Sequence, residues 1–251
     1  PYLTHPDPSV ERRSGFLAPI IGASSDLGTM LQIPYYWEIA PDKDLTFDPI
    51  LTASEGLVMS GEYRQRFSDG MLETRATGTN GERNDANRDK RFRGHIDTST
   101  RFSVNDVWRW GADLKAATDD TYLKRYGISP DSILTSHVFA EGFSGRDYSL
   151  VEGYHFQSLR STDDQQEIPV VAPKLDYNFV GDANHDGGRA TLDLNLQALT
   201  RDIGADSRRL SVTSGWQQPY FGRLGDIWTL LGTVQSDLYH VNEVSVPNRS
   251  G

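Results

Sequence analysis

Residues 57–68 read LVMSGEYRQRFS, and the pattern of this stretch decides the fold class. Mainly apolar or aromatic side chains occupy one set of alternate positions: Leu57, Met59, Gly61, Tyr63, Gln65 and Phe67. The charged side chains fall in the other set: Val58, Ser60, Glu62, Arg64, Arg66 and Ser68. Because successive side chains of a β-strand point to opposite faces, this period of two predicts a strand with one apolar and one charged face.

The same alternation recurs farther along the chain. In residues 91–104 one face holds Phe92, Ile96, Phe102 and Val104, and the other Arg91, Arg93, His95, Asp97, Ser99 and Arg101. In residues 107–116 Trp108, Trp110, Ala112 and Leu114 lie opposite Arg109, Asp113 and Lys115. Later apolar rows are Val171, Pro173, Leu175, Tyr177 and Phe179, and then Leu192, Leu194 and Leu196. Short turn signals separate these runs, which predicts about thirteen strands in an antiparallel hairpin meander, with one short helix candidate at residues 119–126.

Strand length separates the two all-β architectures that fit this pattern. Most of the predicted strands run about 10 to 13 residues, whereas soluble strands centre near 5 or 6 and a tilted membrane-crossing strand needs about 9 to 11. Aromatic residues near strand ends, such as Trp108 and Trp228, fit the girdles of a transmembrane barrel. We therefore predict a large transmembrane β-barrel of the bacterial outer membrane, with apolar side chains toward lipid and charged rows toward a wet lumen. A soluble carbohydrate-binding β-sandwich is the alternative, because alternation alone does not distinguish the two.

Composition excludes several other classes of protein. Only 37% of the residues are hydrophobic and the mean hydropathy is -0.54, so the sequence has no segment fit to be a membrane-spanning helix. The formal net charge of -10 argues against binding to nucleic acid, which depends on Lys and Arg neutralising phosphates. The absence of cysteine excludes a disulfide or a thiolate zinc site within this chain.

Motifs for catalysis are also missing from the sequence. None of the six histidines has the HExxH spacing, and there is no G-x-S-x-G elbow or glycine-rich phosphate loop. We expect neither an enzyme nor a cofactor. Residues 182–187 read DANHDG, with Asp193 in the twelfth position, which superficially matches a calcium loop. Because strands rather than helices are predicted on both sides, we expect a hydrophilic hairpin loop without a metal ion.

Two prolines mark the first two predicted strands, of which the first opens with residues 15–19 and the second lies within residues 28–40. Pro19 and Pro34 have no N–H group to donate to a sheet ladder, so they indicate a weak place in the sheet. The simpler interpretation is that both prolines lie at strand ends or bulges and only shape turns.

The same region resembles a known family. Residues 12–19 read RRSGFLAP, residues 33–41 read IPYYWEIAP, and residues 44–49 read DLTFDP. This order and spacing is similar to the pattern RSGFLxP, then PYYWxIAPxxDxTxxP, of the LPS-assembly protein family LptD. Residues 56–64 (GLVMSGEYR) and 119–123 (DDTYL) resemble later segments of the same family. The resemblance extends in order over nearly the whole chain and is most specific in its first sixty or so residues.

The resemblance implies how the chain is organised. Residues 1–13 are expected to be the tail of a preceding periplasmic domain or a linker, and residues 14–251 the first portion of the barrel, with about half of its strands. The lack of an initial Met and of a signal-like segment also leads us to expect a piece of a longer chain. Family members often carry cysteines that join the periplasmic domain to the barrel, and this stretch has none.

The resemblance also implies a function. Lipopolysaccharide (LPS) is expected to pass its sugars through the lumen and its acyl chains sideways between the first and last strands, into the outer leaflet. Pro19 and Pro34 are then expected to lie beside this lateral gate. The implied partners are LPS, a lipoprotein plug like LptE inside the lumen, and a periplasmic Lpt bridge that contacts the upstream domain. A porin-like or receptor barrel that conducts solutes is the alternative function.

The charged rows supply the candidate contacts with LPS. Six arginines of the predicted lumen wall are candidates to bind phosphates and acidic sugars: Arg64, Arg66, Arg75, Arg91, Arg93 and Arg109. The alternative is that lumen charges pair with one another and merely keep the interior wet.

Overall fold

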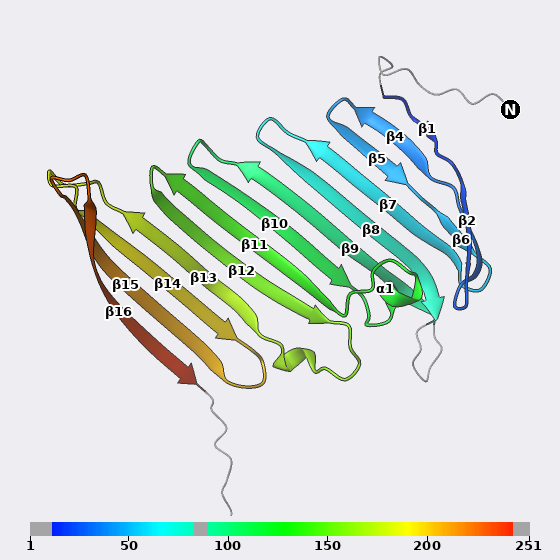
Figure 1. Cartoon of the computed structure of the whole chain (residues 1–251). Coiled ribbons are helices and arrows are strands. Elements are labelled where there is room, and N and C mark those ends of the chain that lie inside the picture. Colours follow the sequence, from blue (N-terminus) through cyan, green and yellow to red (C-terminus); the bar gives the residue numbers. More distant parts are fainter. Residues whose placement is uncertain (1–11, 83–89, 243–251) are drawn as a thin grey trace, which may run out of the picture. The chain divides into compact units, whose positions relative to one another are not determined.

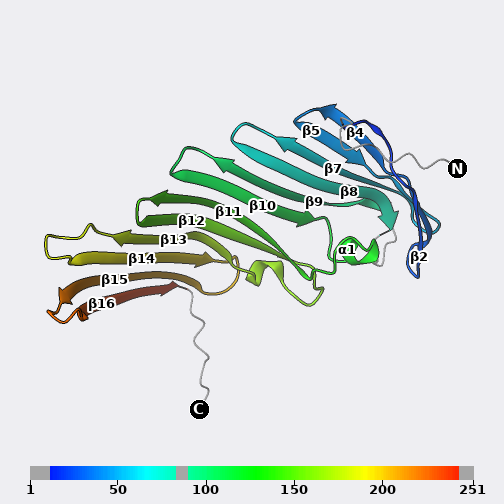
Figure 2. The ribbon, with the colours of Figure 1, turned by 45° about the horizontal axis from the view of Figure 1, so that its top comes forward.

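The computed structural model describes residues 12–82 and 90–242, and these form one antiparallel sheet of 16 strands (Figures 1 and 2). Most of the expected tail, residues 1–11, lies outside the described residues. The helical elements within the described ranges are α1 (Tyr122–Arg125) and a 3-10 turn at Gln165–Glu167. Neither helical segment could cross a membrane, being too short and insufficiently apolar. The predicted all-β meander and the short helix within residues 119–126 are both confirmed.

The described residues divide into two units, which we treat separately. The first comprises the residues up to Thr100 together with Lys115–Asp131, and the second Arg101–Leu114 together with the residues from Ser132 onward. The first unit contains β1 (Gly15–Phe16), β2 (Ile20–Ser24), β3 (Gly28–Gln32), β4 (Tyr35–Ala40), β5 (Lys43–Phe47), β6 (Ile50–Thr52), β7 (Gly56–Arg66) and β8 (Gly70–Glu82). Strands β9 (Lys90–Ser103) and β10 (Trp108–Ala117) contribute residues to both units.

The second unit is a regular meander. It contains β11 (Ile133–Ser144), β12 (Asp147–Ser158), β13 (Val170–Val180), β14 (Arg189–Thr200), β15 (Asp206–Phe221) and β16 (Ile227–Asn242). Figure 1 shows β11 to β16 running side by side, each joined to the next by a hairpin. These strands are 11 to 16 residues long, well above the usual length of soluble strands.

The first strands of the first unit are each broken in two. β1 and β2 are separated by residues 17–19, β3 and β4 by residues 33–34, and β5 and β6 by residues 48–49. Strand β7 then continues unbroken beside both β5 and β6. Thirteen strands lie on the main path of the sheet, and β2, β3 and β6 are the outlying pieces of the broken strands. Each break contains a proline.

The two faces of the sheet differ as the alternation predicts. Cross-strand register places Asp44, Arg64 and Glu73 on one face, and Leu45 and Tyr63 on the other. In the second unit Leu194 lies opposite Val212, and Asn195 opposite Ser211, on alternate faces. Large apolar side chains such as Trp110 (41% exposed) and Leu57 (46% exposed) lie open on the apolar face. No second sheet covers this face within the described residues, so the sandwich alternative has no support.

One apolar row differs from the predicted row. A register shift at Ala172 and Pro173 places both Val171 and Lys174 opposite residues of the charged face, Tyr154 and Glu152. The predicted grouping of Val171 with Leu175 is therefore wrong. The extra residue at the bulge reverses the side-chain alternation, which a strict period of two does not anticipate.

Candidate functional site

The charged face of β5, β7 and β8 carries interlocked ion pairs. Arg64 Nε lies 2.9 Å from Asp44 Oδ1, and Arg75 Nη2 lies 2.5 Å from Glu62 Oε2. The register explains these contacts, because Asp44 is paired with Arg64 across β5 and β7, and Glu62 with Arg75 across β7 and β8. Two of the six candidate arginines are thus engaged by neighbouring carboxylates, while about half of each side chain stays exposed.

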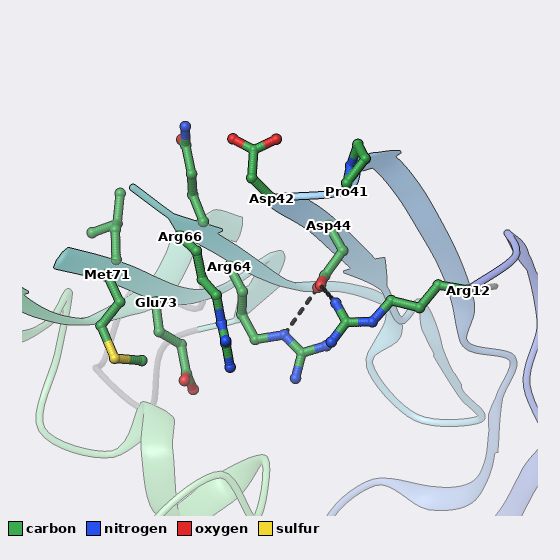
Figure 3. Close-up of a pocket in the computed structure, with 10 residues that line it drawn as sticks. Arg12, Pro41, Asp42, Asp44, Arg64, Arg66, Met71 and Glu73 are labelled. Atoms are coloured by element: carbon green, nitrogen blue, oxygen red, sulfur yellow. Dashed lines mark hydrogen bonds and ion pairs between the residues drawn. The ribbon is translucent and has the colours of Figure 1, made fainter. Parts of the chain in front are cut away.

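A pocket of about 260 Å³ opens on this face, beside the β4–β5 turn. Figure 3 shows the guanidinium groups of Arg12 and Arg64 converging on the buried carboxylate of Asp44 from two sides. Arg66 and Glu73 also line the pocket. Within residues 12–82 and 90–242, no carboxylate forms an ion pair with Arg66, which is exposed. The pocket therefore offers one guanidinium group that has donors to spare for an anionic ligand.

Arg93 lies in a different environment. Its side chain is 2% exposed, and two of its nitrogens bind Asp119, Nε to Oδ2 at 2.9 Å and Nη2 to Oδ1 at 2.7 Å. Nη2 also donates to Thr121 Oγ1 at 2.8 Å, and the rings of Tyr122 and Tyr126 lie 5.6 and 5.7 Å from the guanidinium carbon. Such a bidentate pair is strong because both charges are fixed and hydrogen-bonded.

The partner of Arg93 comes from the segment that connects β10 to β11. This connection, residues 118–132, contains α1 and lies near the end of β8 and the start of β9 (Figures 1 and 2). The contact between Arg93 and Asp119 places it against the charged face. Tyr122 is fully buried there, and Thr77 Oγ1 lies 2.8 Å from its hydroxyl. Leu123 is 2% exposed. We call the described residues 118–131 of this connection the inner segment.

A second set of contacts joins the inner segment to the β6–β7 turn. Glu55 binds Arg125 through one carboxylate oxygen and accepts a hydrogen bond from Tyr126 Oη at 3.1 Å through the other. A Cβ atom on Gly81 would lie 2.7 Å from Tyr126 Oη and 3.2 Å from Glu55 Oε2. Only glycine therefore leaves room for this contact without displacing it.

The inner segment has perturbed titrating groups. Burial alone would raise the pKa of Asp119, but hydrogen bonds from Arg93 and Thr121, with the charge of Arg93, outweigh burial and lower the pKa to about 2. Burial raises the pKa of Tyr126 to about 12, and the neighbouring Glu55 carboxylate acts in the same direction. Both groups are therefore fixed in one charge state over the physiological range.

The last two candidate arginines are exposed. Arg91 forms no ion pair with any residue that the structure describes. In the second unit Arg109 Nε lies 2.6 Å from Glu141 Oε1, its guanidinium carbon lies 5.1 Å from the Phe143 ring, and its side chain is 58% exposed. The six arginines thus form no single cluster, since Arg93 alone of them is buried.

The two predicted prolines lie in aligned breaks of the sheet. Pro19 lies between β1 and β2, and Pro34 between β3 and β4. The breaks are adjacent, because Leu17 N donates to Pro34 O at 2.9 Å and Ile33 N to Pro49 O at 3.4 Å. Pro49, in the third break, extends the line of prolines by one strand.

The calcium-like loop is a turn of the β13–β14 hairpin. The side-chain oxygen of Asn184 accepts hydrogen bonds from the backbone of Asp186 and Gly188, at 3.0 and 2.6 Å. The Asn184 oxygen, which would be a calcium ligand in such a motif, thus accepts hydrogen bonds from the backbone of the turn instead. No group of three or more metal-binding side chains occurs within the described residues.

Sequence reasoning missed three functional candidates. Arg12 falls in the aperiodic N-terminal stretch, Asp119 at the start of the short helix candidate, and Pro49 at the end of the segment 44–49 that resembles the family pattern. The regular spacing of Pro19, Pro34 and Pro49 at every fifteenth residue was the signal that could have revealed the third proline.

Comparison with known proteins gives a consistent result. Residues 91–250 match the family described as LPS transport system D, LptD. The LPS-assembly protein LptD of Actinobacillus pleuropneumoniae serotype 7 is 31% identical over 219 residues, which cover 83% of this chain and 27% of the relative. That of Pectobacterium atrosepticum is 26% identical over 250 residues, 93% of this chain and 30% of the relative. That of Legionella pneumophila strain Paris is 43% identical over 79 residues, 32% of this chain and 9% of the relative. The chain thus spans less than a third of the length of these relatives.

Proposed function

The chain belongs to the LptD family, and from this premise we propose that it is part of an outer-membrane protein that inserts LPS into the outer leaflet. Residues 14–251 supply the first strands of a transmembrane barrel, and residues 1–13 connect them to a preceding periplasmic domain. The charged face lines the lumen and the apolar face contacts lipid. This assignment is supported by long strands with exposed apolar side chains on one face and ion pairs on the other.

The lengths of the connections support an orientation in the membrane. In an antiparallel meander alternate connections lie at the same end of the strands. Among the described residues, one set contains residues 41–42, 67–69, 104–107, 145–146, 181–188 and 222–226, and the other contains residues 25–27, 53–55, 118–132, 159–169 and 201–205. The two longest connections, residues 118–132 and 159–169, both belong to the second set. Outer-membrane barrels have short periplasmic turns and longer extracellular loops. The pocket with Arg12, Arg64 and Arg66 then lies at the periplasmic end, and the inner segment at the extracellular end.

The aligned breaks are the observation that best supports a lateral gate at this edge of the sheet. At Pro19, Pro34 and Pro49 each of the first three strands lacks an N–H donor for the ladder, and the breaks that hold these prolines lie side by side. Each missing bond removes about 0.5–1.5 kcal/mol of net stability from the seam. We assign the lateral gate to this edge, beside Pro19 and Pro34, because it separates at lower cost than any edge made of continuous strands.

The exposed arginines are assigned to LPS contact. Arg66 and Arg91 have donors that no described carboxylate uses, and Arg64, Arg75 and Arg109 exchange partners at modest cost because their ion pairs are half-exposed. Arg93 contributes to the wall rather than to cargo binding, since Asp119 occupies its donors. An LptE-like plug in the lumen and an Lpt bridge at the preceding domain are the proposed partners. The proposed role is transport without bond chemistry.

Photo-crosslinking on the full-length protein in cells tests the gate. A photoreactive residue at Phe16, which is 76% exposed on β1, is expected to capture LPS. The double variant Pro19→Val and Pro34→Val restores two N–H donors and is expected to lower that capture several-fold.

Pro219 provides the matched control. It lies in β15, where the register with β16 runs unbroken from Asp206 to Phe221. Pro219→Val is expected to leave capture at Phe16 unchanged. If the double variant and the reference capture LPS equally at Phe16, the prolines have no role in the gate. Absence of capture at Phe16, with free conductance of solutes, would favour the porin-like alternative.

A further inference from the structure

A second pocket lies on the opposite, apolar face of the second unit. It has a volume of about 220 Å³ and is formed by β14, β15 and β16. Register places two cross-strand rows in it. Leu196, Leu210 and Leu238 form one row, and Ala198, Arg208 and His240 form the next. A leucine groove therefore ends at a pair of basic side chains.

Arg208 is unusual for this face. The same strand carries Leu210, Val212 and Trp216 on the apolar side, and Arg208 is exposed among them. Across the part of the chain that the structure describes, no carboxylate forms an ion pair with Arg208. Asp206, two residues away on the same face, accepts the backbone N–H of Arg201 at 3.0 Å. A cation directed toward lipid without a carboxylate partner is expected to take an anionic group from the lipid itself.

The position along the strand fits a lipid headgroup. Arg208 lies two residues from the start of β15, at the end that the loop lengths assign to the outside, and Tyr220 lies on the same face near the other end. Twelve residues at about 3.3 Å each, tilted by about 40°, span roughly 30 Å across the membrane. Arg208 and His240 are thus at headgroup level in the outer leaflet, while the leucine row reaches the acyl chains.

We propose that this pocket binds one phosphorylated, acylated glycolipid of the outer leaflet, with a phosphate on Arg208 and His240 and an acyl chain against Leu196, Leu210 and Leu238. Guanidinium groups suit phosphate because they donate two parallel hydrogen bonds. The inference rests on the proposed function for the direction of the apolar face. It adds a lipid-binding site on the outer wall that uses neither the lumen arginines nor the broken strands.

Direct lipid binding to the purified full-length protein with its native partner tests the site. The probes are LPS and the same LPS after removal of its phosphates, measured by native mass spectrometry from detergent. The double variant Arg208→Gln and His240→Gln is expected to bind LPS about tenfold more weakly. Dephosphorylated LPS is expected to bind the reference protein as weakly as LPS binds the variant.

Two further variants keep the test sharp. Arg189→Gln is the matched control, because Arg189 lies on the charged face of β14, opposite Gln217, and does not line the pocket. It is expected to bind LPS like the reference. Ala198→Phe fills the groove without changing charge and is expected to weaken binding while the protein stays folded.

Equal binding of LPS by the reference and the double variant would overturn the proposal, as would equal binding of the dephosphorylated lipid. The readout needs no transport step. Failure of LPS insertion with intact binding would therefore count against the proposed function alone, and normal insertion without binding against this site alone.

Discussion

Arg93 in the first unit and Arg109 in the second occupy equivalent positions in the alternation, yet their surroundings are opposite. Arg93 is 1% exposed and held by Asp119, whereas the Arg109 side chain is 58% exposed beside Glu141. The difference comes from the inner segment, which covers Arg93. An arginine on the charged face is therefore buried or open to solvent according to what the connections place over it.

The largest expected effect is at the buried pair. Asp119→Ala leaves the Arg93 charge buried without its carboxylate, which typically costs about 3–5 kcal/mol. We expect the inner segment to detach and become accessible to protease in the full-length protein, with a lower unfolding temperature. Asp119→Asn, which keeps one acceptor oxygen but no negative charge, should fall between this variant and the reference. An unchanged protease pattern would show that Arg93 and Arg109 do not differ in the way described.

Acid should weaken the same contact in the unmodified protein. The pKa of Asp119 is about 2 in the folded protein, against an ordinary value of 3.8, so its contribution to the free energy of unfolding is present above pH 4 and is lost as pH falls from about 4 to 2. The contribution is roughly 2 kcal/mol. Proteolysis of the inner segment by an acid-active protease should rise across this window in the reference and be already high in Asp119→Ala. Release centred near neutral pH would contradict the assignment.

A smaller effect is expected at Gly81. The Cβ atom of Gly81→Ala would press on Tyr126 Oη and disturb its hydrogen bond to Glu55, at a cost of about 1–2 kcal/mol. Gly61→Ala is the control, because its nearest contact would be an ordinary 3.6 Å. Hydrogen exchange should report faster opening of residues 118–131 in the first variant only. Equal exchange in both variants would mean that Glu55 does not hold this segment.

The smallest effect is expected at the exposed pair. Arg109→Gln should change the free energy of unfolding by less than about 1 kcal/mol, because exposed ion pairs are screened by water. In this variant, a photoreactive residue placed next to position 109 should capture measurably less LPS than in the reference protein. A large loss of stability without loss of capture would assign Arg109 to structure and reverse the contrast with Arg93.

Most of the fold could be predicted from the sequence, because the alternation of apolar and charged residues shows directly which face of the sheet each side chain occupies. Residues 57–66 and 108–116 form strands with the expected apolar and charged sides, and the short helix lies within residues 119–126, where it is predicted. The bulge at Pro173 and the breaks in the first three strands could not be predicted from this alternation. An extra residue or a missing ladder bond changes the register without changing the composition of the row.

Only part of the candidate site could be predicted from the sequence. Alternation placed Arg93 correctly on the charged face, but its burial depends on Asp119, 26 residues away in a connection with no periodic signal. The prolines were visible one at a time, and their alignment depends on strand register. Contacts between segments far apart in the sequence depend on tertiary packing, and the residue pattern of one strand does not determine them.

The direction of the two faces is the claim on which the transport account depends. Arg109→Cys and Trp110→Cys place a thiol at adjacent positions of β10 on opposite faces, in a chain that has no other cysteine. In the full-length protein in its membrane, with cysteines outside this chain removed, each thiol is labelled with a membrane-impermeant maleimide and with a lipid-soluble one. We expect the first variant to react with the impermeant reagent and the second only with the lipid-soluble reagent. The reverse pattern, or equal reaction of both thiols from water, would contradict the account.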